Sequence, residues 1–382
     1  MQRLDIVNKW RRIIVKVGSA VITSGAGLDR RRIYLLANQL AKLLAAKIQV
    51  VLVTSGAVAS GRAKVREIVK GLERGLSIPQ KQAAAALGQA GLMQTYEQAL
   101  EVHGLLAAQI LLTAADLRNR ERYHNVSNTF DTLLEWGAVP IVNENDSVVV
   151  QEIKLGDNDN LAAMLTNLLS ADLFINLTNV DGLFDSDPRT NAQAKLLNLV
   201  ERVEAGHLAS ASSHPGLMGT GGILSKIKAA DQAGKSGAYT IIANGLLDDV
   251  LPRLLAGEEI GTLFLPAPRH YPRRKHWIAF ASQQEGEIVI DSGAARALQE
   301  NGRSLLAAGI KEVRGIFQAG GALRVLDQNN TLIGVGLTNY GSQEMSLIMG
   351  LNSRQIAARL GRDDIPEAIH RDNLVLVEQQ ND

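Results

Sequence analysis

The first 265 residues alternate short apolar runs with amphipathic helical patterns, and this alternation restricts the fold more than any other feature of the sequence. The apolar runs expected to form strands lie at 13–17, 50–56, 105–113, 139–146, 172–179 and 239–243. The helical patterns expected between them lie at 29–47, 80–102, 120–136 and 158–169. Repeated strand–helix–strand order predicts an α/β fold with a mostly parallel central sheet and helices on both of its faces.

The pattern changes near residue 265, where the segment PAPRHYPRRKHW combines three of the nine prolines with a run of basic residues. This composition is typical of a linker. Shorter, β-like segments follow it. The sequence therefore predicts an α/β domain over 1–265, a linker over 266–275 and a small β-rich domain over 276–382.

Charge and residue content exclude several classes of protein. Lys and Arg number 40 against 39 Asp and Glu, so the chain as a whole has no strong attraction for nucleic acid. Cysteine is absent, which excludes disulfides, thiolate zinc sites and cysteine nucleophiles, and the histidines lack metal-ligand spacing. No apolar run is typical of a secretory signal or long enough to span a membrane, so we expect a cytoplasmic protein with no membrane association.

Polar residues follow the predicted strands at their carboxyl ends, where parallel sheets bind ligands. The first is Lys16, in the motif KVGSA. A lysine within a buried strand is costly unless it faces a partner or a binding site, so Lys16, followed by Gly18, is a candidate phosphate contact. The alternative is a lysine that extends along the strand edge and keeps its charge in water.

Three polar motifs form a second group of candidates: TSGA at 54–57, NEND at 143–146 and GDNDN at 156–160. Carboxylates suit the ammonium group of an amino acid, and amides suit its carboxylate. Gly56 permits a close approach to the backbone beside the hydroxyl of Ser55. The alternative is that these residues only cap helices and build turns.

The segment GLMGTGGILSKIKAA at 216–230 runs from a glycine-rich loop into a predicted helix. The amides at a helix N-terminus bind anions, and Lys226 adds a positive charge. The alternative is a flexible loop with no ligand. The Walker A, Rossmann and protein-kinase motifs are all absent, so a nucleotide site in this chain needs another framework.

Taken in order, the motifs KVGSA, VTSGAVASG, KQAAAALGQ, VPIVNENDSV, EIKLGDNDNLAA, TNVDGLF and GTGGILSK resemble the amino acid kinase family. NEND with GDNDNL and the late GTGG-x-x-x-K is the most specific combination and resembles the members that act on glutamate. Residues 276–382 resemble the PUA domain attached to many of these proteins. The resemblance covers essentially the whole chain. It implies the amino acid kinase fold and ATP-dependent phosphorylation of the γ-carboxylate of L-glutamate to γ-glutamyl phosphate, the first step of proline biosynthesis.

The resemblance also implies roles for individual residues. Lys16 and Lys226 would act on the transferred phosphoryl group, and Asp159 would hold both lysines in position. The residues implied to bind the substrate are Ser55, Gly56, Asn143, Asp146 and Asn158. The residues implied to bind ATP are Lys16, Thr178, Asn179, Thr220, Gly221, Gly222, Ile223, Leu224, Ser225 and Lys226. The phosphates of the nucleotide, and no protein metal site, would hold the required Mg²⁺.

Two positions depart from the family pattern. Asn179 stands where the family often has aspartate, which puts its contact with the nucleotide in doubt. Ala114 stands where the family tends to have arginine, near the region associated with inhibition by L-proline and with oligomer contacts. Inhibition by L-proline is therefore a hypothesis. The resemblance further suggests a homodimer or homotetramer, and the next enzyme of the proline pathway as a partner.

Three alternative functions stay open. PUA domains elsewhere bind RNA, but residues 276–382 contain nine Lys and Arg against thirteen Asp and Glu, and this net charge of −4 does not favour RNA. A kinase that acts on aspartate or acetylglutamate is the second alternative, and the NEND and GDNDN motifs argue against it. A catalytically inactive regulator is the third, and the presence of Lys16, Asp159 and Lys226 argues against it.

Overall fold

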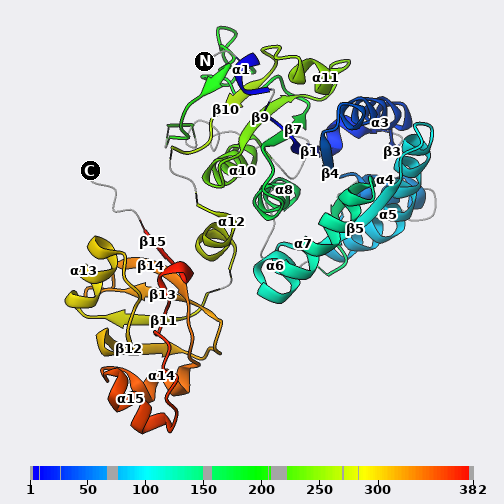
Figure 1. Cartoon of the computed structure of the whole chain (residues 1–382). Helices are drawn as coiled ribbons and strands as arrows, with labels where there is room; N and C mark the ends of the chain where they lie inside the picture. The colour runs from blue at the N-terminus through cyan, green and yellow to red at the C-terminus, as the bar shows by residue number, and fades with distance from the viewer. Residues whose placement is uncertain are drawn as a thin grey trace. The chain divides into compact units, whose positions relative to one another are not determined.

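The computed structural model describes residues 3–7, 9–25, 27–66, 76–148, 157–204, 206–207, 222–268, 271–282 and 284–377. The chain divides into two compact units (Figure 1). The first comprises Met1–Leu117 and Glu121–His270, and the second comprises Arg118–Arg120 and Tyr271–Asp382. The domain limits and the linker expected from the sequence stay predictions. The helix α12 (Arg273–His276) occupies the end of the expected linker.

The first unit is built on a sheet of eight described strands in the order β5-β6-β4-β1-β7-β9-β10-β8. In chain order these strands are β1 (Arg12–Val17), β4 (Gln49–Val53), β5 (Ala107–Leu112), β6 (Val139–Glu144), β7 (Leu173–Thr178), β8 (Leu199–Val200), β9 (Tyr239–Asn244) and β10 (Thr262–Phe264). Neighbouring strands run parallel except for β9 and β10, which are antiparallel. The prediction of a mostly parallel sheet is confirmed.

The helices of this unit include the four that the sequence pattern predicts and the helix expected after the glycine-rich loop. The described helices and the short hairpin are α1 (Leu4–Val7), α2 (Ser19–Ile22), β2 (Thr23–Ser24), β3 (Gly27–Leu28), α3 (Arg30–Ala45), α4 (Ala57–Val65), α5 (Ile78–Glu101), α6 (Ala114–Arg118), α7 (Arg120–Glu135), α8 (Asp157–Leu168), α10 (Ile223–Lys235) and α11 (Val250–Leu255). Asp29 caps α3 as expected, because its side chain accepts a hydrogen bond from the N–H of Arg32. The sequence pattern does not predict α4, since its small residues form no apolar stripe.

Alternate residues of each strand point to opposite faces of the sheet and meet different helices. Val15 and Val17 of β1 belong to the buried cluster that includes residues of α3, α5 and α11. On the opposite face, Ile242 of β9 packs against Ile227 of α10. Lys16 lies between Val15 and Val17, so its side chain points to the face that α8 and α10 cover.

The second unit contains a separate sheet in the order β12-β11-β13-β14-β15. Its strands and helices are β11 (Gln284–Ile290), α13 (Ser292–Asn301), β12 (Ile310–Gly315), β13 (Ala322–Leu326), β14 (Leu332–Leu337), α14 (Ser342–Ile348), α15 (Ser353–Leu360) and β15 (Leu374–Leu376), with short helical turns at Trp277–Ala281, Ala307–Gly309 and Arg371–Asn373. This confirms the expected small β-rich domain. In neither unit do the described residues include a helix with the length and apolar character needed to cross a membrane.

Candidate active site

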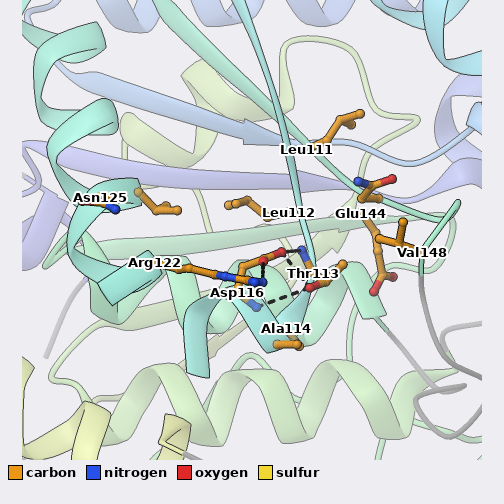
Figure 2. Close-up of a pocket in the computed structure, with 12 residues that line it drawn as sticks. Leu111, Leu112, Thr113, Ala114, Asp116, Arg122, Asn125, Glu144 and Val148 are labelled. Carbon is orange, nitrogen blue, oxygen red and sulfur yellow. Dashed lines mark hydrogen bonds and ion pairs between the residues drawn. The ribbon is translucent and has the colours of Figure 1, made fainter. Parts of the chain in front are cut away.

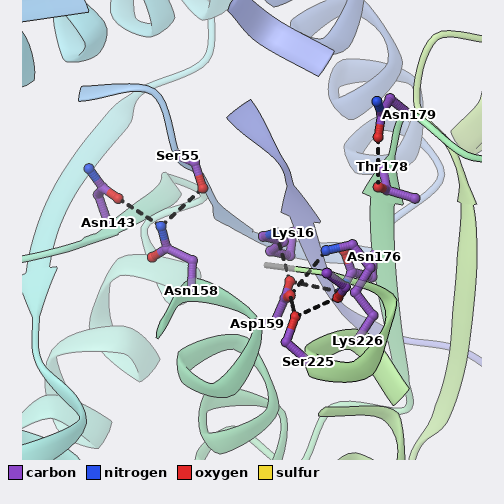
Figure 3. A network of polar contacts seen from close by, with 11 residues as sticks. Lys16, Ser55, Asn143, Asn158, Asp159, Asn176, Thr178, Asn179, Ser225 and Lys226 are labelled. Carbon is purple, nitrogen blue, oxygen red and sulfur yellow. Dashed lines mark hydrogen bonds and ion pairs between the residues drawn. The ribbon is translucent and has the colours of Figure 1, made fainter. Parts of the chain in front are cut away.

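Two lysines and one aspartate meet beyond the middle of the sheet (Figure 3). The Nζ of Lys16, on β1, lies 2.6 Å from Oδ1 of Asp159, on α8. The Nζ of Lys226, on α10, lies 3.1 Å from Oδ2 of the same carboxylate. All three side chains are buried, with exposed fractions of 6%, 1% and 6% for Lys16, Asp159 and Lys226. The structure thus brings together the three residues that the sequence resemblance assigned to catalysis.

Two further side chains hold the Asp159 carboxylate. The hydroxyl of Ser225 donates to Oδ2 over 2.6 Å, and Nδ2 of Asn176 donates to Oδ1 over 3.0 Å. Asn176 lies on β7 directly opposite Lys16 in the parallel register, so both side chains point to the same face of the sheet. Asp159 therefore accepts from four donors on three other elements, which leaves its carboxylate little rotational freedom.

The charges in this cluster do not balance. Burial alone would raise the pKa of Asp159, but the charges of Lys16 and Lys226 outweigh burial and hold this pKa well below its usual range. Burial and the nearby charge of Lys16 lower the pKa of Lys226 to about 8, although Asp159 partly compensates. One carboxylate is shared by two ammonium groups, so the cluster carries a net positive charge, which suits an anionic ligand such as a phosphate.

A second cluster joins three of the residues that were expected to bind the substrate (Figure 3). Nδ2 of Asn158 donates to Oγ of Ser55 over 3.0 Å and to Oδ1 of Asn143 over 3.2 Å. Ser55 follows β4 and Asn143 lies near the end of β6, and these two strands are parallel neighbours. Asn158 precedes Asp159 in the first turn of α8, so the two clusters are adjacent.

The remaining residues expected to bind the substrate lie in turns beside this cluster. Gly56 has a φ of +106°, in the left-handed region that favours glycine, and it precedes the first residue of α4. Asp146 is half-buried in the turn after β6. The described part of the GDNDN motif begins at Asp157, so Gly156 lies outside the described residues.

The residues expected to bind ATP lie at the end of β7 and the start of α10. Thr178 is buried, and its hydroxyl donates over 3.5 Å to Oδ1 of Asn179, whose side chain is exposed. Gly222 precedes α10 and adopts an extended conformation. Ile223, Leu224, Ser225 and Lys226 form the first turn of this helix. Thr220 and Gly221 lie outside the described residues.

The start of α10, with the two lysines, suits the phosphates of a nucleoside triphosphate. The helix α10 has 13 residues, and Gly222 at its N-cap has no side chain to cap it, so the amides of its first turn suit an anion. Lys226 in that turn and Lys16 nearby supply positive charge. Among the residues that the structure describes, no three or more His, Cys, Asp or Glu side chains are grouped as metal ligands.

A pocket of about 580 Å³ opens at the carboxyl ends of β5 and β6 (Figure 2). Its lining includes Ala114, Asp116, Arg122 and Glu144. Asp116 accepts from the N–H and the hydroxyl of Thr113 over 2.8 and 2.7 Å, and Arg122 Nη1 donates to it over 2.8 Å. The pocket thus presents charged groups of both signs, the ion pair of Asp116 and Arg122 and the carboxylate of Glu144 at the end of β6.

Asn176 was not among the residues predicted from the sequence. The signal that identified Lys16, a polar residue within an apolar strand, also applies to Asn176. Asn176 is a fully buried polar residue within the apolar strand LFINLT. Such a residue needs a hydrogen-bonding partner, which here is Asp159. Its Oδ1 is also buried and has no hydrogen-bond partner among the described residues.

Comparison with known proteins identifies the families that the two parts of the chain resemble. Residues 11–244 match the model of the amino acid kinase family, and residues 286–360 match the model of the PUA domain. The glutamate 5-kinase of Syntrophotalea carbinolica is 45% identical over 374 residues, which cover 98% of this chain and 99% of that protein. The glutamate 5-kinase of Citrifermentans bemidjiense is 46% identical over 377 residues, 98% of this chain and 100% of that protein.

Among solved structures, an isopentenyl phosphate kinase aligns with 66% of this chain and 100% of its own length, with 20% identity and a TM-score of 0.47. The family matches and the curated relatives extend over both units, and they agree with the resemblance noted in the motifs. The chain belongs to the amino acid kinase family and, within it, to the family of the glutamate 5-kinases.

Proposed function

We propose that this protein transfers the γ-phosphoryl group of ATP to the γ-carboxylate of L-glutamate. An oxygen of that carboxylate attacks the γ-phosphorus, the bond from phosphorus to the β–γ bridging oxygen breaks, and ADP leaves. The products are γ-glutamyl phosphate and ADP, so the reaction would begin proline biosynthesis. The observation that carries the proposal is the buried group of Lys16, Asp159 and Lys226 directly beside the amide cluster.

The absence of a general base among the assigned residues agrees with this chemistry. The attacking carboxylate is ionised at neutral pH, so no proton has to be removed from it. Phosphoryl transfer depends mainly on the position of the reactants and on stabilisation of the charge that develops. Lys16 and Lys226 would supply that stabilisation, and Asp159 would keep their ammonium groups close together in the absence of ligand.

The residues around the lysines divide into two sides. Ser55, Asn143 and Asn158, with Gly56 and Asp146, would bind glutamate. On the other side, the first turn of α10 and Thr178 would bind ATP, together with Asn179, Thr220 and Gly221. Mg²⁺ would be held by the phosphates of ATP, where it neutralises part of their charge. Asn158 and Asp159 are consecutive, so one helical turn would hold the acceptor beside the phosphoryl contacts.

The test is to trap the acyl phosphate. Purified protein, ATP and Mg²⁺ are mixed with hydroxylamine and with L-glutamate, D-glutamate, L-aspartate or N-acetyl-L-glutamate, and the hydroxamate is measured. We expect hydroxamate with L-glutamate alone. Product with another amino acid would keep the reaction class and change the substrate. No product with any of them, from folded protein, would refute the proposal.

We also propose L-proline as a feedback inhibitor. The pocket at the carboxyl ends of β5 and β6 is lined by the ion pair of Asp116 and Arg122 and by the carboxylate of Glu144, and charged groups of both signs suit a small zwitterion. Ala114 lines this pocket, at the position where the family tends to have arginine. The glutamate-dependent rate should fall at millimolar L-proline and not at millimolar D-proline. A rate that L-proline leaves unchanged would refute the hypothesis.

For the PUA domain we propose a structural or regulatory role rather than RNA binding, because residues 276–382 carry a net negative charge. Salt-sensitive, submicromolar binding of RNA in a filter-binding titration would contradict this. A homodimer or homotetramer, a contact with the next enzyme of the pathway and a cytoplasmic location stay predictions. Sedimentation velocity on the full chain would test the first of these.

A further inference from the structure

The motif KQAAAALGQ, on α5, has no role in the chemistry described above, yet its helix contacts the substrate side of the site. The reason is backbone contact between α4 and α5. A Cβ added at Gly88 would lie 1.9 Å from the carbonyl oxygen of Ala57, and one added at Gly61 would lie 1.7 Å from that of Ala84. Only glycine at these two positions allows the helices to pack this closely.

This close packing brings Gln89, the residue after Gly88, into contact with Asn143. Nδ2 of Asn143 donates to Oε1 of Gln89 over 2.8 Å. Both side chains are buried, with exposed fractions of 9% for Gln89 and 2% for Asn143. Asn143 lies on the face of β6 that points toward α5, as do Val139 and Ile141, which belong to the cluster shared with that helix.

The hydrogen bonds form a directed chain. Asn158 donates to Ser55 and to Oδ1 of Asn143, and Asn143 in turn donates to Gln89. Each end of the chain carries one polar atom that is buried and has no hydrogen-bond partner among the described residues. These atoms are Nε2 of Gln89 and Oδ1 of Asn158.

An unpaired buried polar atom costs about 1–3 kcal/mol, so two of them at one site indicate groups that a ligand completes. The free Oδ1 of Asn158 is an acceptor, as an ammonium group requires. It stays free because Nδ2 of the same amide is bonded to Ser55 and Asn143. The orientation of the Asn143 amide therefore decides which atom Asn158 presents to the substrate.

We propose that Gln89 is a positioning residue for the amino acid substrate, acting through Asn143. By accepting from Nδ2 of Asn143, it holds that amide with Oδ1 toward Asn158 and so keeps Oδ1 of Asn158 available to the substrate ammonium group. This inference rests on the proposed function, since it concerns the same site. It also assigns a function to the KQAAAALGQ motif, in which Gly88 brings the helix close and Gln89 makes the contact.

The test is Gln89→Met, which keeps the length of the side chain and removes its hydrogen-bonding groups, with Gln89→Leu as a second variant if the first does not fold. Without Gln89, the buried amide of Asn143 loses its acceptor. We expect the KM for L-glutamate to rise about tenfold, the effect of one lost hydrogen bond, while kcat and the KM for ATP stay within about threefold. In a protein that already carries Asn143→Ala, adding Gln89→Met should cause no further rise in the KM for L-glutamate.

Thr95→Val is the matched control, since Thr95 is buried on the same helix and its hydroxyl bonds to the carbonyl of Gly91 rather than to any described residue of the site. Its kinetic constants should equal those of the wild type, and thermal unfolding should show all variants folded. An unchanged KM in Gln89→Met, or a rise that persists fully in the Asn143→Ala background, overturns the positioning role while wild-type turnover leaves the proposed function intact. No turnover of L-glutamate by the wild type would overturn both.

Discussion

Replacement of Asp159 by Asn tests the central ion pair with little change in shape. The carboxylate lies 2.6 Å from Nζ of Lys16 and 3.1 Å from Nζ of Lys226, and it is 1% exposed. The substitution leaves two buried ammonium groups with no counterion between them. We therefore expect both a loss of stability and a loss of catalysis.

The size of the stability loss follows from the distances and from the pKa of Lys226. At an effective dielectric constant of about 20, the two attractions are about 6 and about 5 kcal/mol before desolvation is counted. Removal of one member of a buried pair costs about 3–5 kcal/mol in measured cases. Lys226 can limit the loss by releasing its proton, because its pKa is already lowered to about 8 with Asp159 present and falls further when that carboxylate is removed. We expect the free energy of unfolding to fall by about 3 kcal/mol.

The loss of stability in Asp159→Asn should depend on pH. In the variant the folded-state pKa of Lys226 lies further below its unfolded value than in the wild type, because the Asp159 carboxylate is gone. Between these two pKa values the folded state binds fewer protons than the unfolded state, so the stability of the variant rises as pH increases. The deficit relative to the wild type should therefore be larger at pH 6 than at pH 9. Urea unfolding at both pH values measures it, and hydroxamate formation measures kcat, which should fall by about 10²-fold or more.

Asp231→Asn is the control for this experiment. Asp231 pairs with Lys235 over 2.6 Å on the same helix as Lys226, but both side chains are about 40% exposed. An exposed pair of this kind contributes about 0.3–0.5 kcal/mol. If Asp159→Asn costs no more stability than the control, or if it keeps wild-type kcat, the role assigned to Asp159 is wrong.

Three further predictions follow from individual contacts. The wild-type kcat/KM should fall above pH 8, because the ammonium form of Lys226 is lost and its pKa is lowered to about 8; a rate that stays flat to pH 10 would contradict this. In thermal unfolding, Gly88→Val should have a free energy of unfolding about 1–3 kcal/mol or more below that of the wild type, because its Cβ would overlap the carbonyl of Ala57. Tyr96→Phe should cost about 1 kcal/mol in urea unfolding, because the buried phenol loses its 2.9 Å hydrogen bond to Thr54.

Six of the eight described strands of the large sheet, all but β8 and β10, were predictable because they are short, apolar and separated by periodic helical segments. The same reasoning identified Lys16, since a charged residue inside such a strand needs a partner. It could not identify that partner. Asp159 lies far along the chain, and only the strand order, with β1 beside β7 and α8 over both, brings the two together.

The contact between Gln89 and Asn143 could not be predicted from the sequence for a different reason. Gln89 lies in a helix rich in alanine and glycine, where small residues give no apolar stripe and so no prediction of which face is buried. Asn143, the other residue of this contact, was a candidate because it lies at the polar end of an apolar strand. Nothing in the spacing of the two motifs shows that α4 and α5 pack backbone against backbone, which is what makes the contact.

The position of α8 shows why two consecutive residues can serve two different clusters. Neighbouring residues of an α-helix point about 100° apart, so side chains at successive positions meet different parts of the surroundings. Asn158 meets Ser55 and Asn143, whereas Asp159 meets Lys16 and Lys226. Because both arise from one turn, the separation between the proposed amino acid site and the proposed phosphoryl contacts is set by backbone geometry rather than by flexible side chains. A reaction that depends mainly on the position of its reactants is helped most by such a rigid connection.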